Sequence, residues 1–373
     1  MTALTVRESF LRCMNFEPVD RVPNWELGYW GQTIDRWIEE GMPPEEADRG
    51  SFHGHAFFGI DNRPFLPVNF NPIPSFEGKV IEESDRYVIY TDGDGGTRKA
   101  LKEGTVRWTR MSMDQHLSAF VKRPEDLEII KERLDPHAPG RTPDNLEEVV
   151  APYRDLDDPL CAVPNAAFGF YSHMRRFMDT EGLSYAWYDW PDAIHDFADH
   201  LTDFCIETLR PWLALIKPDY FNFFEDFAGK GGPLISPPLF RKFLLPGYQR
   251  IIEFVRSQGI DVIWFDSDGY IDTLIPLILE AGVTCIWPLE VAAGEDPRVI
   301  RKQYGHDLAL SGGIDKRELT KDRASIRREL EAKIPMIEDG GFIPTIDHAV
   351  PPDISYDNWL YYLELKSEML GGR

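Results

Sequence analysis

Residues 262–287 read VIWFDSDGYIDTLIPLILEAGVTCIW and contain one complete unit of the expected fold. The apolar run at 262–265 predicts a buried strand, the segment at 270–280 predicts a helix, and the apolar run at 284–287 predicts the next strand. A helix that separates two such strands is typical of parallel neighbours in one sheet. This stretch therefore predicts an α/β protein with a parallel sheet.

Units of the same kind recur through residues 151–373. Further strand-like runs lie at 159–164, 220–224, 308–310 and 342–346. Further helices are predicted at about 191–216, 238–257, 296–304 and 321–338. At least six such units favour a closed (β/α)8 TIM barrel over a doubly wound sheet, and no GxGxxG motif follows any strand.

Residues 1–150 differ in composition and pattern from residues 151–373. They are polar and irregular, and they are rich in proline and aromatic residues. They predict an opening helix and a hairpin whose turn is TDGDGG, residues 91–96. We expect this N-terminal extension to pack over the barrel mouth. The whole chain, 1–373, is predicted to form a single domain.

Composition indicates which classes of binding partner and which cell compartment to expect. Lys and Arg total 40 against 63 for Asp and Glu, and a net charge of −23 disfavours nucleic acid and anionic membranes as partners. The four cysteines have no disulfide-like spacing, which is typical of reduced thiols. The first residues lack the apolar run of a signal peptide, and no stretch of about 18 apolar residues occurs. We expect a cytoplasmic enzyme.

Acidic residues follow five consecutive predicted strands, at the ends where a barrel builds its active site. These residues are Glu225, Asp226, Asp266, Asp268, Glu290, Asp315 and Asp347, and His348 stands beside the last of them. Glu225, Asp266, Asp268 and His348 are the predicted catalytic residues, while Asp226 and Glu290 are predicted to contact substrate. The aromatic segment that holds Trp25, Glu26 and Tyr29 is predicted to line the mouth and to favour a flat organic substrate.

The acidic cluster allows three interpretations. Glu225, Asp266, Asp268 and His348 could hold a divalent metal such as zinc, since they offer oxygen and imidazole ligands. Alternatively, crowded carboxyl groups could keep one another protonated, so that one acts as a general acid without metal. In the third interpretation Asp266 or Asp268 only caps the helix predicted near residue 270.

Several longer segments carry a resemblance to a known family. They are RVPNWE near the start, FFEDFAGKGGPLISPPLFRKFLLPGY, FDSDGYIDTLIPLILEAGV, WPLE, YGHDLALSGGID and GGFIPTIDHAVPPDIS. In this order they resemble the uroporphyrinogen decarboxylase superfamily over most of the chain. The resemblance implies a (β/α)8 barrel and one of two enzyme types, a cofactor-free porphyrinogen decarboxylase or a corrinoid-dependent methyltransferase.

Two departures from the family pattern bear on this choice: the first disfavours a porphyrinogen decarboxylase, and the second disfavours a thiol-methylating enzyme and so favours relatives that act on the methyl-donor side. Where the decarboxylases carry RQAGR to hold substrate carboxylates, this chain reads PNWELGYWGQ and has no arginine until Arg36. Where thiol-methylating members bind zinc through HxC and a later cysteine, it has Asp266-Ser267-Asp268 and Asp347-His348.

The resemblance therefore implies a methyltransferase that moves a methyl group from a small O- or N-methyl compound to a corrinoid on a partner protein. A decarboxylase of another carboxylated substrate is the alternative, and a barrel that binds a ligand without chemistry is a third hypothesis. Members of the superfamily are often dimers, so a homodimer is expected.

Overall fold

A five-stranded parallel sheet forms the centre of the computed structural model, which describes residues 3–47, 54–107, 109–110 and 112–371. Its strand order is β13-β12-β11-β10-β7. The strands are β7 (Tyr220–Phe224), β10 (Val262–Asp266), β11 (Cys285–Trp287), β12 (Ala309–Ile314) and β13 (Phe342–Ile346). Their burial on both faces follows from apolar and aromatic sequences such as YFNFF. The prediction of an α/β protein with a parallel sheet is confirmed.

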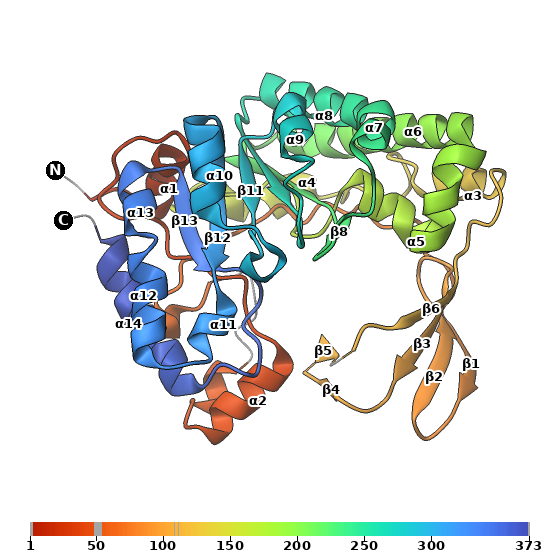
Figure 1. Cartoon of the computed structure of the whole chain (residues 1–373). Helices are drawn as coiled ribbons and strands as arrows, with labels where there is room; N and C mark the ends of the chain where they lie inside the picture. The colour runs from red at the N-terminus through yellow and green to blue at the C-terminus, as the bar shows by residue number, and fades with distance from the viewer. Residues whose placement is uncertain (1–2, 48–53, 108, 111, 372–373) are drawn as a thin grey trace.

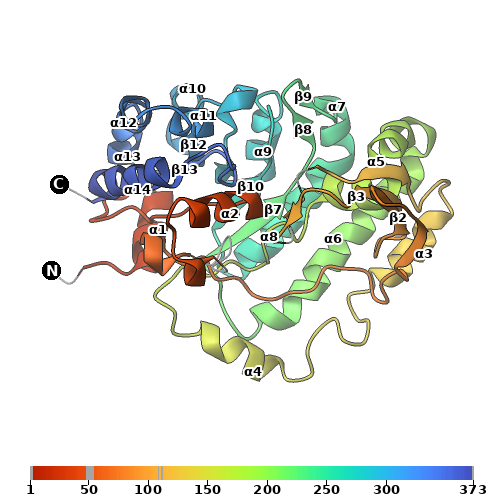
Figure 2. The ribbon, with the colours of Figure 1, turned by 90° about the horizontal axis from the view of Figure 1, so that it is seen from below.

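Helices surround these strands (Figures 1 and 2). The longer ones are α1 (Val6–Met14), α2 (Gly31–Glu39), α3 (Asp126–Arg133), α5 (Phe170–Asp189), α6 (Pro191–Leu213), α8 (Leu245–Ser257), α10 (Pro297–Tyr304), α12 (Arg323–Glu331) and α14 (Tyr356–Leu370). The shorter ones are α4 (Leu146–Val150), α7 (Pro237–Leu239), α9 (Ile275–Ala281), α11 (Lys316–Leu319) and α13 (Ile334–Asp339). No helix in the described part of the chain is both long and apolar enough to cross a bilayer.

A second, antiparallel sheet is built from the N-terminal part of the chain. It has the order β1-β2-β3-β6, with β1 (Lys79–Glu83), β2 (Tyr87–Thr91), β3 (Thr97–Leu101) and β6 (Gln115–Ser118). Two-residue strands form two further small pairs: β4 (Thr105–Val106) with β5 (Thr109–Arg110), and β8 (Ala228–Gly229) with β9 (Gly232–Pro233). The antiparallel pairing of β2 and β3 confirms the hairpin predicted at residues 91–96. In both views this small sheet lies beside α5 (Figures 1 and 2).

The predicted elements differ from the observed ones in identifiable places. The runs 220–224 and 342–346 match β7 and β13 in full. The run 159–164 is not a strand, because only Cys161 pairs there, through isolated parallel bridges to Phe65 and Tyr220. The helix predicted at 238–257 is α7, a π-helix (Phe240–Leu244) and α8 in succession, and the one at 321–338 is α12 followed by α13.

Two glycines allow close approaches near the carboxyl ends of the strands. A side-chain carbon on Gly169, which precedes α5, would lie 1.8 Å from the Phe224 carbonyl oxygen. A side-chain carbon on Gly312 in β12, where φ is +102°, would lie 1.7 Å from the Pro288 carbonyl oxygen. Only glycine therefore permits α5 to start against the end of β7 and β12 to pass the loop after β11.

Candidate active site

The predicted acidic residues share one edge of the parallel sheet, since all five strands run in the same direction. Glu225 and Asp226 follow β7, Asp266 is the last residue of β10, and Asp347 and His348 follow β13. Neither Asp266 nor Asp268 caps a helix, because α9 begins only at Ile275 and has no side-chain cap. The cap interpretation of these two residues is therefore wrong.

His348 and Asp268 form a pair at this edge. His348 Nε2 lies 3.6 Å from Asp268 Oδ2, and both side chains are about one third exposed, at 34% and 39%. The nearby carboxylate of Asp268 raises the pKa of His348, against the opposing effect of burial. His348 therefore keeps its proton to a higher pH than an isolated histidine does.

Asp266 lies deeper than this pair and is only 5% exposed. Burial raises its pKa well above the usual range, the neighbouring charge of Asp268 raises it further, and Arg63 opposes both. These shifts favour the protonated form of the Asp266 carboxyl group. The structure thus places a buried carboxyl group at the carboxyl end of β10 and a histidine of raised pKa at that of β13.

Arg63 is a charged residue of the interior that the sequence did not reveal. Its guanidinium carbon lies 5.3 Å from the ring centre of Trp25 and 5.1 Å from that of Trp287. It donates a hydrogen bond to the Glu26 carbonyl oxygen and borders a small cavity of about 20 Å³. Burial lowers the pKa of Arg63. Nothing in the local sequence signals this residue, because its neighbours come from distant segments.

Glu225 is fully buried and is held by the start of α5. Its carboxylate accepts hydrogen bonds from the backbone N–H groups of Phe170 (2.5 Å), Tyr171 (3.2 Å) and Ser172 (2.9 Å), and from the Tyr248 hydroxyl. Burial raises the pKa of Glu225 to about 7, although these hydrogen bonds favour the charged form. Its side chain anchors a helix and is separate from the His348–Asp268 pair.

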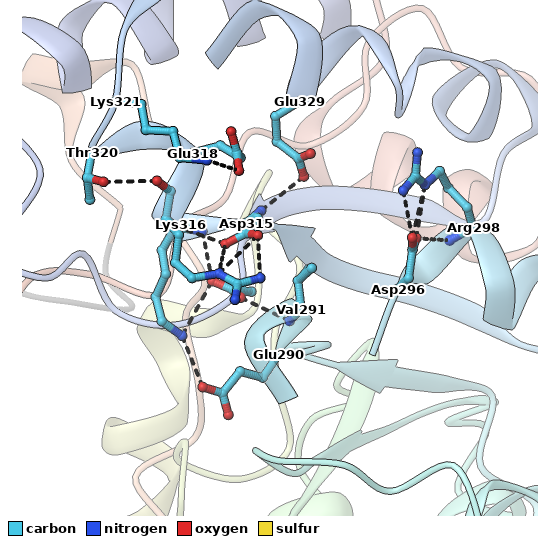
Figure 3. A network of polar contacts seen from close by, with 12 residues as sticks. Glu290, Val291, Asp296, Arg298, Asp315, Lys316, Glu318, Thr320, Lys321 and Glu329 are labelled. Atoms are coloured by element: carbon cyan, nitrogen blue, oxygen red, sulfur yellow. Dashed lines mark hydrogen bonds and ion pairs between the residues drawn. The ribbon is translucent and has the colours of Figure 1, made fainter. Parts of the chain in front are cut away.

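Lysine and arginine side chains neutralise the other predicted acids. Lys316 Nζ lies 3.2 Å from a Glu290 oxygen and 3.5 Å from an Asp347 oxygen, and Figure 3 shows Lys316 reaching toward Glu290. Asp226 pairs with Arg175. Asp315 accepts from the Arg317 backbone and caps α11. Of this group, Asp347 is the one that is completely buried.

Asp347 joins three loops at the same edge. Its carboxylate accepts hydrogen bonds from the backbone N–H of Val291, which follows β11, at 3.0 Å, and from that of Lys316, which follows β12, at 3.1 Å. Burial raises the pKa of Asp347, and Lys316 opposes this effect. Asp347 therefore fixes the loop positions beside His348.

The predicted aromatic mouth lies largely inside the protein. Trp25 is fully buried against Phe10 and Trp264. Glu26 forms a buried ion pair of 2.6 Å with Lys366, accepts from the Tyr362 hydroxyl, and accepts from the backbone N–H of Ile346 at 3.0 Å.

Tyr29 packs against Trp37 and Trp359 in a second apolar cluster. As placed, all three side chains, those of Trp25, Glu26 and Tyr29, contact protein neighbours and support the sheet from within.

The proposed metal ligands do not converge in this arrangement. Among the described residues, no group of three or more His, Cys, Asp and Glu side chains is placed to hold a metal ion. Asp268 and His348 are adjacent, whereas Glu225 is occupied by the start of α5. The donor set as placed therefore does not fit the four-ligand site, and zinc binding stays a prediction.

Two of the cavities in the described part of the chain bear on the site, and neither is lined by His348 or Asp268. One of about 440 Å³ is bordered by α1, α13 and the end of α14, near the amino end of β13, and contains none of the predicted site residues. The other, of about 220 Å³, lies where the small sheet meets the start of α5 and the end of β7, and Asp226 is part of its wall. The second cavity adjoins the strand-end acids, since Asp226 follows Glu225 directly at the end of β7.

The family model and the curated relatives that match this chain agree on one family. The family model described as uroporphyrinogen decarboxylase (URO-D) matches residues 115–368. Curated relatives include the uroporphyrinogen decarboxylase of Danio rerio, 25% identical over 64% of this chain, and one from Thermus thermophilus, 24% identical over 69%. The aligned region spans 64% and 74% of those two proteins.

A solved structure described as a methyltransferase from Methanosarcina mazei has the same fold. It superposes with a TM-score of 0.62 at 15% identity, covering 98% of this chain and 99% of that one.

Proposed function

Because the chain belongs to the uroporphyrinogen decarboxylase family, we propose that it is a methyltransferase of that family. The proposed reaction moves a methyl group from a small O- or N-methyl compound to a reduced corrinoid, which is the second substrate. The bond between the methyl carbon and its oxygen or nitrogen breaks, the methyl group bonds to cobalt, and the departing oxygen or nitrogen takes a proton.

The observation that carries this proposal is the pair of proton donors at the strand ends. Asp268 raises the pKa of His348, and burial raises the pKa of Asp266, so both shifts favour the form that carries a proton. A methyl ether or methylamine is a poor substrate for nucleophilic attack until its oxygen or nitrogen can leave with a proton. His348 is the more accessible donor, and we assign it the proton transfer, with Asp268 as its positioning partner.

The cysteines support an external methyl acceptor. All four are buried and free, and burial raises the pKa of each thiol, to about 11 for Cys13 and about 12 for Cys161. None of them offers a thiolate to attack the methyl group near neutral pH. A cobalt nucleophile brought by the corrinoid would supply that function.

We further propose that the sheet closes as a (β/α)8 barrel with the His348–Asp268 pair at its mouth. Three observations support closure: the parallel bridges Phe65–Cys161 and Cys161–Tyr220 extend the sheet beyond β7, and the parallel bridge Tyr29–Val350 lies beyond β13. The likeness to the Methanosarcina mazei structure over nearly the whole chain agrees with this architecture. The N-terminal extension would then cover part of the mouth.

Decarboxylation is the second candidate, and one observation favours it. The curated relatives are decarboxylases, and a neutral Asp266 could protonate the carbanion that remains when carbon dioxide leaves. Against it, the stretch 24–33 contains no arginine, and its one carboxylate, Glu26, is neutralised by Lys366. The main proposal also includes a corrinoid protein as partner, a homodimer and a cytoplasmic location.

The deciding experiment offers cob(I)alamin and a panel of aromatic methyl ethers, methanol and N-methylamines to the purified protein. We expect the absorbance change that accompanies methylation of cob(I)alamin with at least one donor class, and its loss in His348→Gln. Release of carbon dioxide from a carboxylated substrate, with no methyl transfer from any donor, would move decarboxylation to first place.

A further inference from the structure

The cavity of about 220 Å³ between the small sheet and the strand ends is lined by arginines from two separate parts of the chain. Arg98 comes from β3, and Arg175 and Arg176 come from α5. Arg98 is only 8% exposed. Three guanidinium groups thus line one cavity of a protein whose net charge is −23, and each of them is paired with an aspartate.

Ion pairs hold these arginines in place. Arg176 binds the Asp94 carboxylate in the β2–β3 turn with two hydrogen bonds of 3.0 and 2.7 Å, which joins the small sheet to α5. Arg98 donates through Nε to Asp92 at 2.6 Å. Arg175 donates to the carbonyl and carboxylate oxygens of Asp226. The positions of the guanidinium groups are therefore fixed before any ligand arrives.

The rest of the wall indicates the kind of anion. Phe168 and Phe224 contribute aromatic surface. Burial, together with the charges of Arg98 and Arg175, lowers the pKa of His116, so that this residue is a neutral hydrogen-bonding group. Asp226 in the same wall repels a doubly charged phosphate more strongly than a singly charged carboxylate.

We propose that this cavity binds the carboxylate of an aromatic or similarly flat organic acid, and that the methyl donor is such an acid. The inference about the donor rests on the proposed function, whereas the binding site itself does not. Roughly 150 Å³ of apolar space suffices for benzene, so the cavity accommodates one ring with its carboxylate. Arg98 lies outside residues 115–368 that match the family model, so this wall includes a part of the chain beyond that match.

The test measures binding by calorimetry without any methyl acceptor, so that a missing methyl transfer does not affect the result. Benzoate is the probe, benzamide is its uncharged isostere, and inorganic phosphate is the competing anion. We expect benzoate to bind and benzamide and phosphate not to bind. Arg98→Gln and Arg175→Gln should each weaken benzoate about tenfold or more, since each removes charge-assisted hydrogen bonds.

Two further variants guard against misfolding and non-specific charge effects. Asp226→Asn removes the carboxylate that competes for Arg175 and should tighten benzoate binding, a result that a damaged protein would not give. Arg21→Gln breaks an ion pair with Asp61 outside the cavity and should leave benzoate binding unchanged. Equal binding of benzoate and benzamide, tighter binding of phosphate, or unchanged affinity in both cavity arginine variants would overturn the proposal.

Discussion

His348 Nε2 lies 3.6 Å from Asp268 Oδ2, although one residue follows β13 and the other follows β10. Parallel strands with β11 and β12 between them thus bring an imidazole and a carboxylate together at one edge.

The first prediction concerns the proton on His348. Asp268→Asn removes the carboxylate that raises the pKa of His348, so the basic limb of the pH–rate profile should move to lower pH. His348→Gln should lower kcat by about 10²- to 10⁴-fold, the range for loss of a general acid. His306→Gln is the matched control, because His306 pairs with Asp339 away from this edge. An unchanged profile in Asp268→Asn would remove the positioning role.

The second prediction concerns metal content. Because Asp268 and His348 are adjacent while Glu225 is held by α5, we expect less than one equivalent of zinc after zinc loading and dialysis. Elemental analysis of the wild type beside Asp268→Ala and His348→Ala measures this. One full equivalent in the wild type that is lost in both variants would instead establish the metal-ligand prediction.

The third prediction concerns Glu225 and the pH dependence of stability. Its pKa in the folded protein is about 7, above the ordinary value of 4.5. The stability that comes from its protonated form is present below about pH 4.5 and is lost as the pH rises through 7. The free energy of unfolding of the wild type minus that of Glu225→Gln should therefore be more favourable at pH 5 than at pH 8. Urea titrations at both values test this, and equal differences would contradict it.

The fourth prediction concerns the buried pair of Glu26 and Lys366. Lys366→Met leaves Glu26 charged and unpaired in the interior, which should cost about 3–5 kcal/mol of the free energy of unfolding. The double variant Glu26→Gln, Lys366→Met should recover much of that loss. Arg36→Gln, in the exposed Arg36–Glu40 pair, should cost about 0–1 kcal/mol. A double variant as unstable as the single one would show that the pair does more than neutralise charge.

The strands and the edge they share were predictable because β7, β10, β11 and β13 are short apolar runs with clear ends. The strand ends then placed Asp266 and His348 at one edge. Helix α5 was missed, because its sequence mixes polar and apolar residues without a clear stripe and contains a break at Asp179.

The partners of the acids could not be read from the sequence. Because α5 was not predicted, two sets of contacts could not be predicted either. They are the hydrogen bonds from the first turn of α5 to Glu225 and the ion pair of Asp226 with Arg175. Arg63, Lys316 and Lys366 meet their partners only through tertiary packing, and no local pattern marks such contacts. The candidate site was therefore predictable as a set of acids, whereas their charge states and partners required the structure.

The hydrogen bonds of Asp347 link three loops, and this affects how substitutions in those loops combine. One carboxylate is shared by the backbone of the loops after β11 and β12 and stands in the loop after β13, so a shift in any one loop displaces a hydrogen bond in another. Substitutions in these three loops should therefore be epistatic, with combined effects that differ from the sum of the single ones. Libraries that diversify the loops together will reach functional combinations that stepwise selection at one loop would discard.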